Sequence, residues 1–397
     1  MKINIVSIYF PPENGAAANR VFKMASFLRA NGNEVQVITA MPNYPFGKIY
    51  KGYKGLWCNE IIDGISVRRY WIYASNSKNP LLRIFSMISF SISLVFAIPI
   101  LLRRSADINI VCSPPLMSGF VASFLCKFSR GKLVLNISDL WPLSAFELGV
   151  IKKGTFYSFL ESLESRMYKK ADLIMTQSEE SVDYIKSKCN SSFFLYRNVA
   201  NGNKYISEVY PDSRTNGFRI IYAGLLGVAQ GILNILKSLD WNSLDVVLDL
   251  YGDGNESNEI QKFIAENGIS NIKFHGMIST EQLNQVLPSY HASLIPLVNP
   301  IYGAFPSKIF TAMASGLPIL YCGEGEAADF VKKYNIGLVN ASDDFNGLKD
   351  NIFMLKSMPE EEYLRVRQNG IDLSNSTFNF KNINENLVKE LSKLANE

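Results

Sequence analysis

Residues 222–231, "YAGLLGVAQG", have the composition of a phosphate-binding turn. Gly224, Gly227 and Gly231 follow an apolar strand pattern and precede a helical one. Glycine at such a turn lets the backbone approach a ligand, and the next helix presents free N–H groups to an anion. The turn lacks the lysine and hydroxyl of a P-loop, which argues against an ATPase. The alternative is an ordinary strand-to-helix turn whose glycines serve geometry alone.

A second candidate phosphate-binding segment is "AFPSKIFTAMASGLPIL", residues 304–320. Pro306 and Ser307 favour the start of a helix, which places Lys308 in the first turn. The helix dipole disfavours a cation there, and a bound anion would remove that penalty. A lysine on a solvated helix face is the alternative.

Asp139, in "LNISDLWPLSAFELG" (135–149), is the main candidate for acid–base chemistry. It follows a predicted strand directly and lies beside Trp141. A carboxylate at a strand's carboxyl end is suited to proton abstraction or to stabilising a cationic sugar transition state. A helix cap or turn-forming residue is the alternative. Glu147 is a weaker candidate for the same role.

Two further segments carry candidate binding residues. Glu324 and Glu326, in "YCGEGEAADFV", follow a predicted strand and could accept hydrogen bonds from ribose or sugar hydroxyls, or simply favour a helix start. In "YFPPENGAAANR" (9–20), the small residues from Gly15 and Ala16 onward leave the backbone open to an acceptor or a phosphate. An ordinary loop is the alternative there.

Several residue patterns are absent from the sequence. The two histidines, His275 and His291, are isolated, and no Asp-x-Asp occurs, so we expect no metal and no cofactor. There is no GxSxG, and no GxGxxG follows the first strand. The five scattered cysteines include no CxxC pair, which is typical of small core residues in a reducing compartment.

Apolar, β-branched runs alternate with helical patterns along the whole chain. "INIVSIYF", "EVQVITAM", "INIVCSP", "KLVLNIS", "DLIMTQS" and "SFFLYRN" predict strands in the first half. A polar stretch at 198–217 has the composition of a linker, after which the pattern restarts with "RIIYAG". We therefore predict an α/β protein with two Rossmann-like parallel-sheet domains, 1–200 and 201–377, that face each other across a cleft. An amphipathic helix at about 378–397 could pack back on the first domain.

Charge is divided unevenly between the two halves of this 397-residue chain, which is 47% hydrophobic. Residues 1–200 carry 24 Lys and Arg against 13 Asp and Glu, a net +11, whereas residues 201–397 carry 16 against 23, a net −7. Such asymmetry suggests that the first domain faces anionic lipid or nucleic acid. Chance surface composition is the alternative.

Residues 79–105, "NPLLRIFSMISFSISLVFAIPILLRRS", raise the question of a membrane. Between Arg83 and Arg103 lie 19 uncharged residues, about the minimum for a spanning helix, but four serines and Pro99 dilute the stretch. A spanning helix, a buried helix and a helix docked on anionic inner-leaflet lipid are the three alternatives, and the basic first half favours the last. The amino terminus lacks signal-peptide features, so we expect a cytoplasmic, peripherally membrane-associated protein.

Taken together, the motifs "IYFPPENGAAANR", "ISDLWP", "YAGLLGVAQG", "FPSKIFTAMASGLPIL" and "GEGEA" resemble family 4 retaining glycosyltransferases of GT-B fold. The resemblance covers essentially the whole chain. It is strongest to the branch that builds bacterial O-antigen and capsule repeats, which includes L-fucosamine transferases.

This resemblance implies that the second domain binds a UDP-sugar donor. The implied donor-binding residues are Gly224, Gly227, Gln230, His275, Met277, Ser307, Lys308, Glu324 and Glu326. Asp139 and Lys308 would be catalytic, and Gly15, Ala16, Trp141 and Glu147 would face the acceptor. The implied acceptor is a polyprenyl-diphosphate-linked saccharide, with no nucleic-acid partner.

The chain departs from the family pattern at four positions. Leu225 and Gln230 stand where Arg and Lys are usual, and Gly303 and Thr311 replace two glutamates. These changes remove cationic phosphate contacts and a ribose partner, so Lys308 must carry more of the charge neutralisation. The alternatives to a transferase are a sugar-nucleotide 2-epimerase of the same fold and an inactive nucleotide-sugar-binding scaffold.

Overall fold

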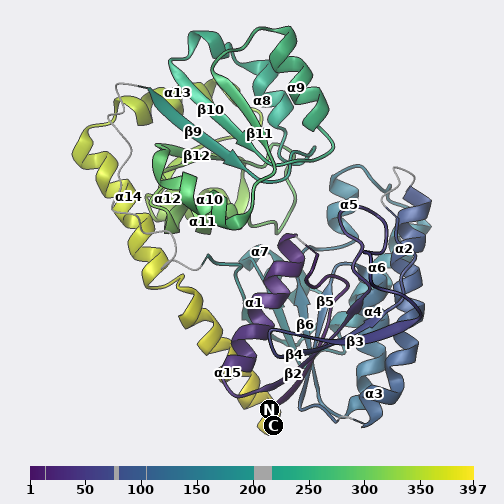
Figure 1. The fold of residues 1–397 in the computed structure, drawn as a ribbon. Helices are drawn as coiled ribbons and strands as arrows, with labels where there is room; N and C mark the ends of the chain where they lie inside the picture. The colour runs from purple at the N-terminus through teal and green to yellow at the C-terminus, as the bar shows by residue number, and fades with distance from the viewer. Residues whose placement is uncertain (14, 76–79, 104, 201–216) are drawn as a thin grey trace. The chain divides into compact units, whose positions relative to one another are not determined.

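The computed structural model describes residues 1–13, 15–75, 80–103, 105–200 and 217–397, and it divides the chain into two compact units (Figure 1). Unit 1 is Met1–Arg197 together with Asn384–Glu397, and unit 2 is Asn198–Ile383. Each unit contains one sheet with helices packed on it. Most of the stretch predicted as a linker, residues 201–216, lies outside the described residues.

The sheet of unit 1 has the strand order β3-β4-β2-β1-β5-β6-β7-β8. Every neighbouring pair except β3 and β4 is parallel. The central strands are apolar and buried on both faces, as parallel strands covered by helices must be. The strands are β1 Lys2–Val6, β2 Glu34–Ala40, β3 Trp57–Ile62, β4 Ile65–Tyr70, β5 Ile108–Ser113, β6 Lys132–Ile137, β7 Leu173–Thr176 and β8 Ser192–Leu195. The helices are α1 Ala16–Ala30, α2 Pro80–Ser93, α3 Ile98–Arg103, α4 Leu116–Cys126, α5 Leu143–Glu147, α6 Thr155–Tyr168, α7 Glu179–Lys186 and α15 Phe380–Asn396.

An antiparallel hairpin, β3–β4, lies at the edge of this sheet and was not expected from the sequence. Its turn is Asp63-Gly64, whose φ angles of 47° and 74° are those of a two-residue hairpin turn. The side chains of β3 alternate between exposed and partly buried, as in an edge strand with one solvated face.

Unit 2 contains a six-stranded, fully parallel sheet in the order β11-β10-β9-β12-β13-β14. Its strands are β9 Phe218–Ala223, β10 Val246–Tyr251, β11 Ile272–Gly276, β12 Ala292–Pro296, β13 Ile319–Cys322 and β14 Gly337–Asn340. Its helices are α8 Ile232–Ser238, α9 Ser257–Glu266, α10 Thr280–Val286, α11 Lys308–Ala314, α12 Gly325–Lys333, α13 Phe345–Ser357 and α14 Glu360–Asn375. Two apolar cores, one on each face, hold this sheet between its helices.

The apolar stretch 79–105 forms α2, a 3-10 turn at Leu94–Ala97 and α3, while residues 79 and 104 lie outside the described part. Among the described residues, no helix has both the length and the apolar character needed to cross a bilayer. Phe90 and Leu94 are buried in the core of unit 1, whereas Ile92 and Phe96 are 60% and 63% exposed. The segment therefore packs on the sheet with one face and presents apolar side chains on the other.

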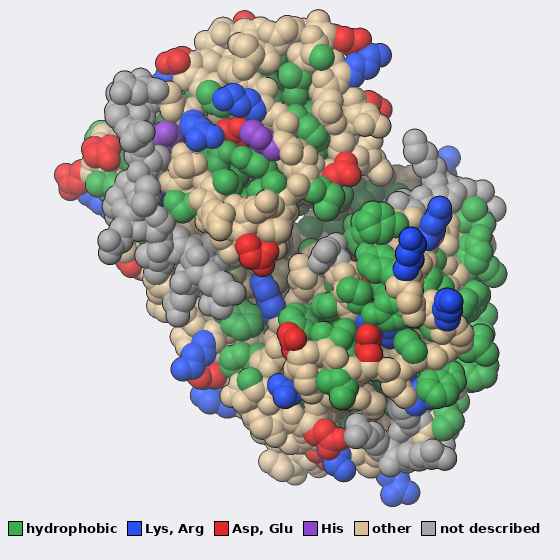
Figure 2. All heavy atoms as spheres, viewed as in Figure 1, with side chains coloured by type: hydrophobic (Ala, Val, Ile, Leu, Met, Phe, Trp, Pro, Cys, Tyr) green, Lys and Arg blue, Asp and Glu red, His purple; other side chains and the backbone are tan. Residues whose placement is uncertain are grey.

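Helix α4 contacts both α2 and α6, and these three helices leave aromatic side chains uncovered. Phe85, Phe124, Phe156 and Phe159 are all exposed, and Figure 2 shows hydrophobic side chains gathered over this side of unit 1. Lys170, just after α6, places its ammonium 4.9 Å from the ring centre of Phe124. Unit 1 therefore carries an apolar surface with a basic group on it.

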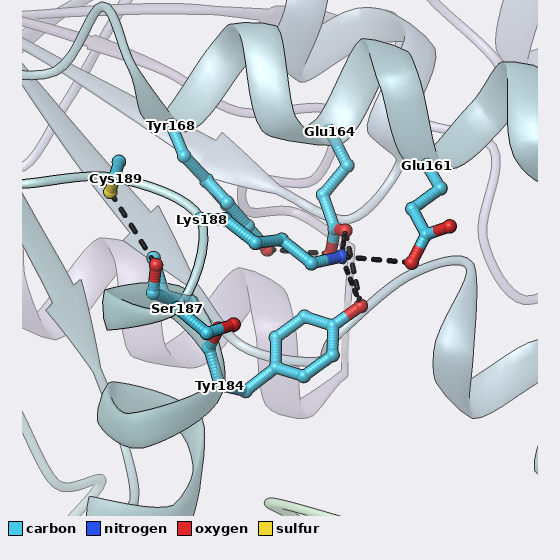
Figure 3. A network of polar contacts seen from close by, with 8 residues as sticks. Glu161, Glu164, Tyr168, Tyr184, Ser187, Lys188 and Cys189 are labelled. Carbon is cyan, nitrogen blue, oxygen red and sulfur yellow. Dashed lines mark hydrogen bonds and ion pairs between the residues drawn. The ribbon is translucent and has the colours of Figure 1, made fainter.

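A buried polar network fastens α6 to the chain after α7 (Figure 3). The Glu164 side chain is fully buried, and its Oε2 lies 2.6 Å from Lys188 Nζ. Lys188 also contacts Glu161 Oε1 at 3.2 Å and Tyr184 Oη at 2.5 Å, while Tyr168 Oη donates to Glu164 Oε1 at 2.8 Å. Burial raises the pKa of Glu164, and the ammonium of Lys188 opposes that rise.

Helix α15 returns the end of the chain to unit 1. Leu387, Leu391 and Leu394 on this helix are buried, and Asn384 accepts a 2.8 Å hydrogen bond from the Tyr196 hydroxyl. The chain therefore passes from unit 1 to unit 2 and back again.

Candidate functional site

Gly224 stands at the carboxyl end of β9, directly against Lys308. Its φ is +147°, and a Cβ added there would lie 2.3 Å from Lys308 Cε. Its N–H donates to Tyr251 O at the end of β10, at 2.8 Å. Only glycine fits this position. Gly224 and Lys308, both singled out from the sequence, therefore lie against each other.

Lys308 begins α11, and its side chain returns to the end of β9. Nζ donates to the Tyr222 hydroxyl at 2.9 Å and lies 4.1 Å from the centre of the Tyr222 ring. Burial lowers the pKa of Lys308 to about 7. Ser307 is the N-cap residue but its side chain makes no capping hydrogen bond. A partly desolvated ammonium next to a glycine turn is a suitable phosphate ligand.

Tyr222 was not singled out by the sequence, where it reads only as part of the "RIIYAG" strand. Besides accepting from Lys308, its hydroxyl donates to the carbonyl of Leu225. Tyr222 thus connects the lysine to the turn that follows β9. Such a contact between distant residues leaves no local signal in the sequence.

The turn 225–231 is held in place from both sides. Leu226 N donates to Asp253 O at 3.0 Å, and Asn299 N donates to Ala229 O at 3.1 Å. Gln230 N donates to Gly227 O at 3.1 Å, and the amide oxygen of Gln230 is buried without a hydrogen-bond partner in the described part of the chain. The turn is therefore fixed, with unused polar capacity at Gln230.

The start of α8 differs from the sequence-based expectation that its N–H groups are free to bind a phosphate. The carboxylate of Glu256 accepts a hydrogen bond from the Leu233 N–H in the first turn of this helix. A negative side chain there accepts a hydrogen bond from an otherwise unpaired N–H and interacts favourably with the helix dipole. It thus occupies the position that a bound phosphate would take. The glycine turn and Lys308 therefore remain the candidates for phosphate binding, rather than the whole α8 N-terminus.

His275 uses its side chain for packing within unit 2. Its ring stacks on Tyr251 at 4.4 Å between centroids, and Nε2 lies 2.5 Å from Asp249 Oδ1. Arg219 Nη2 lies 2.9 Å from the other oxygen of Asp249. Burial would raise the pKa of Asp249, but the hydrogen bonds from His275 and Arg219 hold it below its usual value. The backbone around His275 and the 65% exposed Met277 remain for ligand contact.

The two glutamates after β13 lie at the start of α12. Glu324 is the N-cap residue, and its Oε1 accepts hydrogen bonds from Ser342 N at 2.9 Å and Ser342 Oγ at 3.0 Å. Glu326 lies in the first turn of the helix. Glu324 thus ties its turn to the segment after β14, and one carboxylate oxygen already has protein partners.

In unit 1, Asp139 follows β6 by two residues. Its side chain reaches solvent, yet nearby protein atoms desolvate it enough to raise its pKa, an effect that the charge of Arg20 opposes. Arg20, on α1, donates to the hydroxyl of Ser138. Trp141 packs partly against the core of unit 1, and Glu147 is exposed at the end of α5.

Gly15 and Ala16 form the start of α1, and a buried carboxylate fixes the loop before them. Gly15 is the N-cap, in extended conformation, and a Cβ there would lie 3.2 Å from the Tyr44 ring. Glu13 accepts hydrogen bonds from the N–H groups of Asn43 at 2.8 Å and Tyr44 at 2.9 Å. Burial raises the pKa of Glu13. The sequence did not indicate Glu13, because its partners Asn43 and Tyr44 lie some 30 residues away.

Comparison with known proteins agrees with this geometry. The family described as Glycosyl transferases group 1 matches residues 218–356. Unit 2 therefore carries a glycosyltransferase group 1 domain. Over 332 residues the chain is 24% identical to a protein of Escherichia coli K12 whose name describes it as a colanic acid biosynthesis glycosyl transferase, WcaI, covering 80% of this chain and 82% of that protein.

Solved structures resemble the whole chain in fold. Sucrose-phosphate synthase of Thermosynechococcus elongatus gives a TM-score of 0.77 at 17% identity, covering 99% of this chain and 98% of that one. Anabaena Alr3699/HepE in complex with UDP and glucose gives 0.72 at 16% identity, covering 99% and 100%. The glycosyltransferase WaaG, involved in lipopolysaccharide biosynthesis, gives 0.67 at 14% identity, covering 98% and 99%. The two parallel-sheet units thus have the GT-B fold, as the sequence predicted.

Proposed function

We propose that this protein is a retaining glycosyltransferase that moves a sugar, an N-acetylated amino or deoxyamino sugar, from a UDP-sugar to a lipid-linked saccharide. The observation that carries the proposal is the contact of Lys308 with Gly224 and Tyr222, because all three lie within the segment that matches the glycosyltransferase family. The relatives named above support the class of reaction. Synthesis of a bacterial surface polysaccharide such as O-antigen or capsule is the proposed role.

In the proposed reaction, the diphosphate of the donor is the leaving group. Its negative charge increases as the glycosidic bond breaks, and a preorganised cation stabilises that charge more in the transition state than in the ground state. Lys308 supplies the cation, and the rigid turn 225–231 supplies backbone N–H groups. Because neither Leu225 nor Gln230 is cationic, Lys308 is the main charged contact that we propose for the phosphates.

Asp139 is the proposed group of unit 1 that orients the acceptor hydroxyl. The hydroxyl attacks the anomeric carbon on the face from which the diphosphate departs, and its proton passes to a departing phosphate oxygen. Gly15, Ala16, Trp141 and Glu147 are proposed to contact the acceptor. No metal is proposed, because the ammonium and the N–H groups would neutralise the leaving group.

We also propose that unit 1 docks on the cytoplasmic leaflet of a membrane. The uncovered aromatic side chains of α2, α4 and α6 and the nearby basic groups suit an anionic lipid surface. Flotation with vesicles containing an anionic lipid tests this. Phe85→Ser with Phe96→Ser should reduce binding, whereas Phe353→Ser with Met354→Ser, at side chains that are also exposed but lie in unit 2, should not. Equal binding by both variants would contradict the docking surface.

A transfer assay tests the enzymatic proposal. The purified protein is incubated with a panel of UDP-sugars and a synthetic polyprenyl-diphosphate saccharide, in EDTA and then in Mg²⁺, and products are identified by mass spectrometry and NMR. We expect transfer with retained configuration in EDTA, lost in Lys308→Gln and kept in Lys262→Gln, a surface lysine of the same unit. Epimerised donor without transfer would identify a 2-epimerase instead. Donor binding without turnover of any kind would identify a scaffold.

A further inference from the structure

Arg20 is a cation near the carboxyl ends of the strands of unit 1. It projects from α1, and its guanidinium donates to Ser138 Oγ just past the end of β6. In the sheet order, β5 lies between β1, which leads into α1, and β6. Burial raises the pKa of Cys112, at the end of β5, and the charge of Arg20 opposes that rise. The guanidinium therefore lies over the carboxyl ends of neighbouring parallel strands, where such sheets bind ligands.

Arg20 has a buried nitrogen that makes no hydrogen bond within the described part of the chain. Its Nε is buried without a hydrogen-bond partner, and among the described residues the guanidinium donates to the Ser138 hydroxyl alone. A guanidinium has five N–H donors, and leaving a buried donor without a partner is energetically unfavourable. The hydrogen bond to Ser138 thus holds the Arg20 side chain in place, while its Nε–H has no acceptor.

Arg69, in the same unit, shows what a purely structural arginine looks like here. Its three nitrogens donate to Glu60, to the carbonyl of Ala40 and to the carbonyl of Pro11. By contrast, Arg20 makes no ion pair with a carboxylate in the described part of the chain, although Asp139 lies close enough to feel its charge. A partly desolvated guanidinium with neither a salt bridge nor backbone partners has the donors for an external anion.

We propose that Arg20 binds a phosphate of a substrate diphosphate at the carboxyl edge of the unit 1 sheet. A guanidinium matches two phosphate oxygens with two parallel N–H donors, which an ammonium cannot do. The inference rests on the proposed function for the source of that diphosphate, which is either the sugar donor or the lipid-linked acceptor. The diphosphate group that Arg20 would bind is chemically the same in the sugar donor and in the lipid-linked acceptor.

Titration calorimetry with inorganic pyrophosphate tests the site without requiring turnover. Lys308→Gln first removes the main cation of unit 2, and Arg20→Gln is then added. We expect Lys308→Gln to retain weak pyrophosphate binding that Arg20→Gln lowers at least about tenfold, the effect of losing one charged bidentate contact. Arg29→Gln, an exposed arginine of the same helix, should change it less than about twofold.

Three results would overturn the proposal: no pyrophosphate binding by the wild type, its complete loss in Lys308→Gln alone, or unchanged binding after Arg20→Gln. Thermal melting of each variant checks folding, and Arg20→Lys provides a second variant that keeps the charge but loses the two-pronged contact. It should bind pyrophosphate more weakly than the wild type. Binding that depends on Arg20 would stand even if no UDP-sugar were ever transferred.

The source of the phosphate follows from two further measurements on Arg20→Gln. A weaker Kd for UDP with an unchanged KM for the lipid-linked acceptor assigns the donor diphosphate. A higher acceptor KM with an unchanged UDP Kd assigns the acceptor. If the pyrophosphate site is real but neither constant changes, the site does not serve the proposed reaction, and the inference is wrong.

Discussion

Binding of UDP should take up a proton at Lys308, and the amount can be worked out from its pKa. Burial lowers the pKa of the free ammonium to about 7, whereas a neighbouring diphosphate favours the charged form and raises it. At pH 6 the lysine of the free protein is about 90% protonated, so uptake should be about 0.1 proton. At pH 7 it should be about 0.5, and at pH 8 about 0.9, provided that the bound pKa exceeds about 10.

Calorimetry in buffers of different ionisation enthalpy measures this uptake directly. The observed enthalpy of UDP binding is plotted against the buffer enthalpy, and the slope is the number of protons bound. Measuring at pH 8 avoids the titration of the UDP phosphate itself near pH 6. Lys308→Gln should bind UDP more weakly, with a slope near zero. A slope near zero at pH 8 in the wild type would refute either the lowered pKa or the contact between Lys308 and the phosphates.

Three further substitutions probe two contacts of the candidate site and the buried network of unit 1. Gly224→Ala should displace Lys308, because the new Cβ would lie 2.3 Å from Lys308 Cε, and it should weaken UDP binding at least about tenfold. The control is Gly268→Ala, which is also at positive φ but has no atom within 4 Å of the new Cβ. It should lower the stability by only about 1 kcal/mol and leave UDP binding intact. Tyr222→Phe should weaken UDP binding several-fold, because it frees Lys308 and the turn from their hydrogen bonds to the Tyr222 hydroxyl. Tyr50→Phe, which removes a hydrogen bond to Tyr44 O in unit 1, should not change UDP binding. Equal Kd values of the two variants for UDP would rule out a positioning role for Tyr222. Lys188→Met should leave Glu164 buried without its cation and lower the stability of unit 1 by about 3–5 kcal/mol in thermal or denaturant unfolding. Substitution of the exposed Lys262 by Met should cost less than about 1 kcal/mol. Similar melting of both variants would show that the network of Figure 3 contributes little to stability.

The two sheets could be predicted from the sequence because parallel strands buried on both faces appear as short apolar runs between helical patterns. The β3–β4 hairpin was missed, although Asp63-Gly64 is a recognisable turn signal, because its strands carry polar side chains on one face. The stretch 79–105 remained ambiguous, since hydropathy alone does not separate a core-facing side from an exposed apolar side. Its structure combines both.

The candidate site was only partly predictable, and the reason is sequence separation. Gly224 and Lys308 were indicated by local turn and helix patterns, and they do lie in contact. Tyr222 and Arg20 act through partners 86 and 118 residues away, respectively, so no local pattern identifies them. Glu256 was also missed, since its acceptor role at the start of α8 depends on how two loops meet.

The double passage of the chain between the units has a consequence for synthesis on the ribosome. Domains generally fold as units, the N-terminal one first, while translation proceeds at about 5–20 residues per second. Here the last 14 residues, Asn384–Glu397, belong to unit 1 and carry Leu387, Leu391 and Leu394 into buried positions. The unit that is begun first therefore cannot be completed until residues 384–397 have been synthesised. Unit 2, although later in the chain, has its whole sequence available earlier, so a nascent chain stalled before α15 would hold a finished second unit and an unfinished first one.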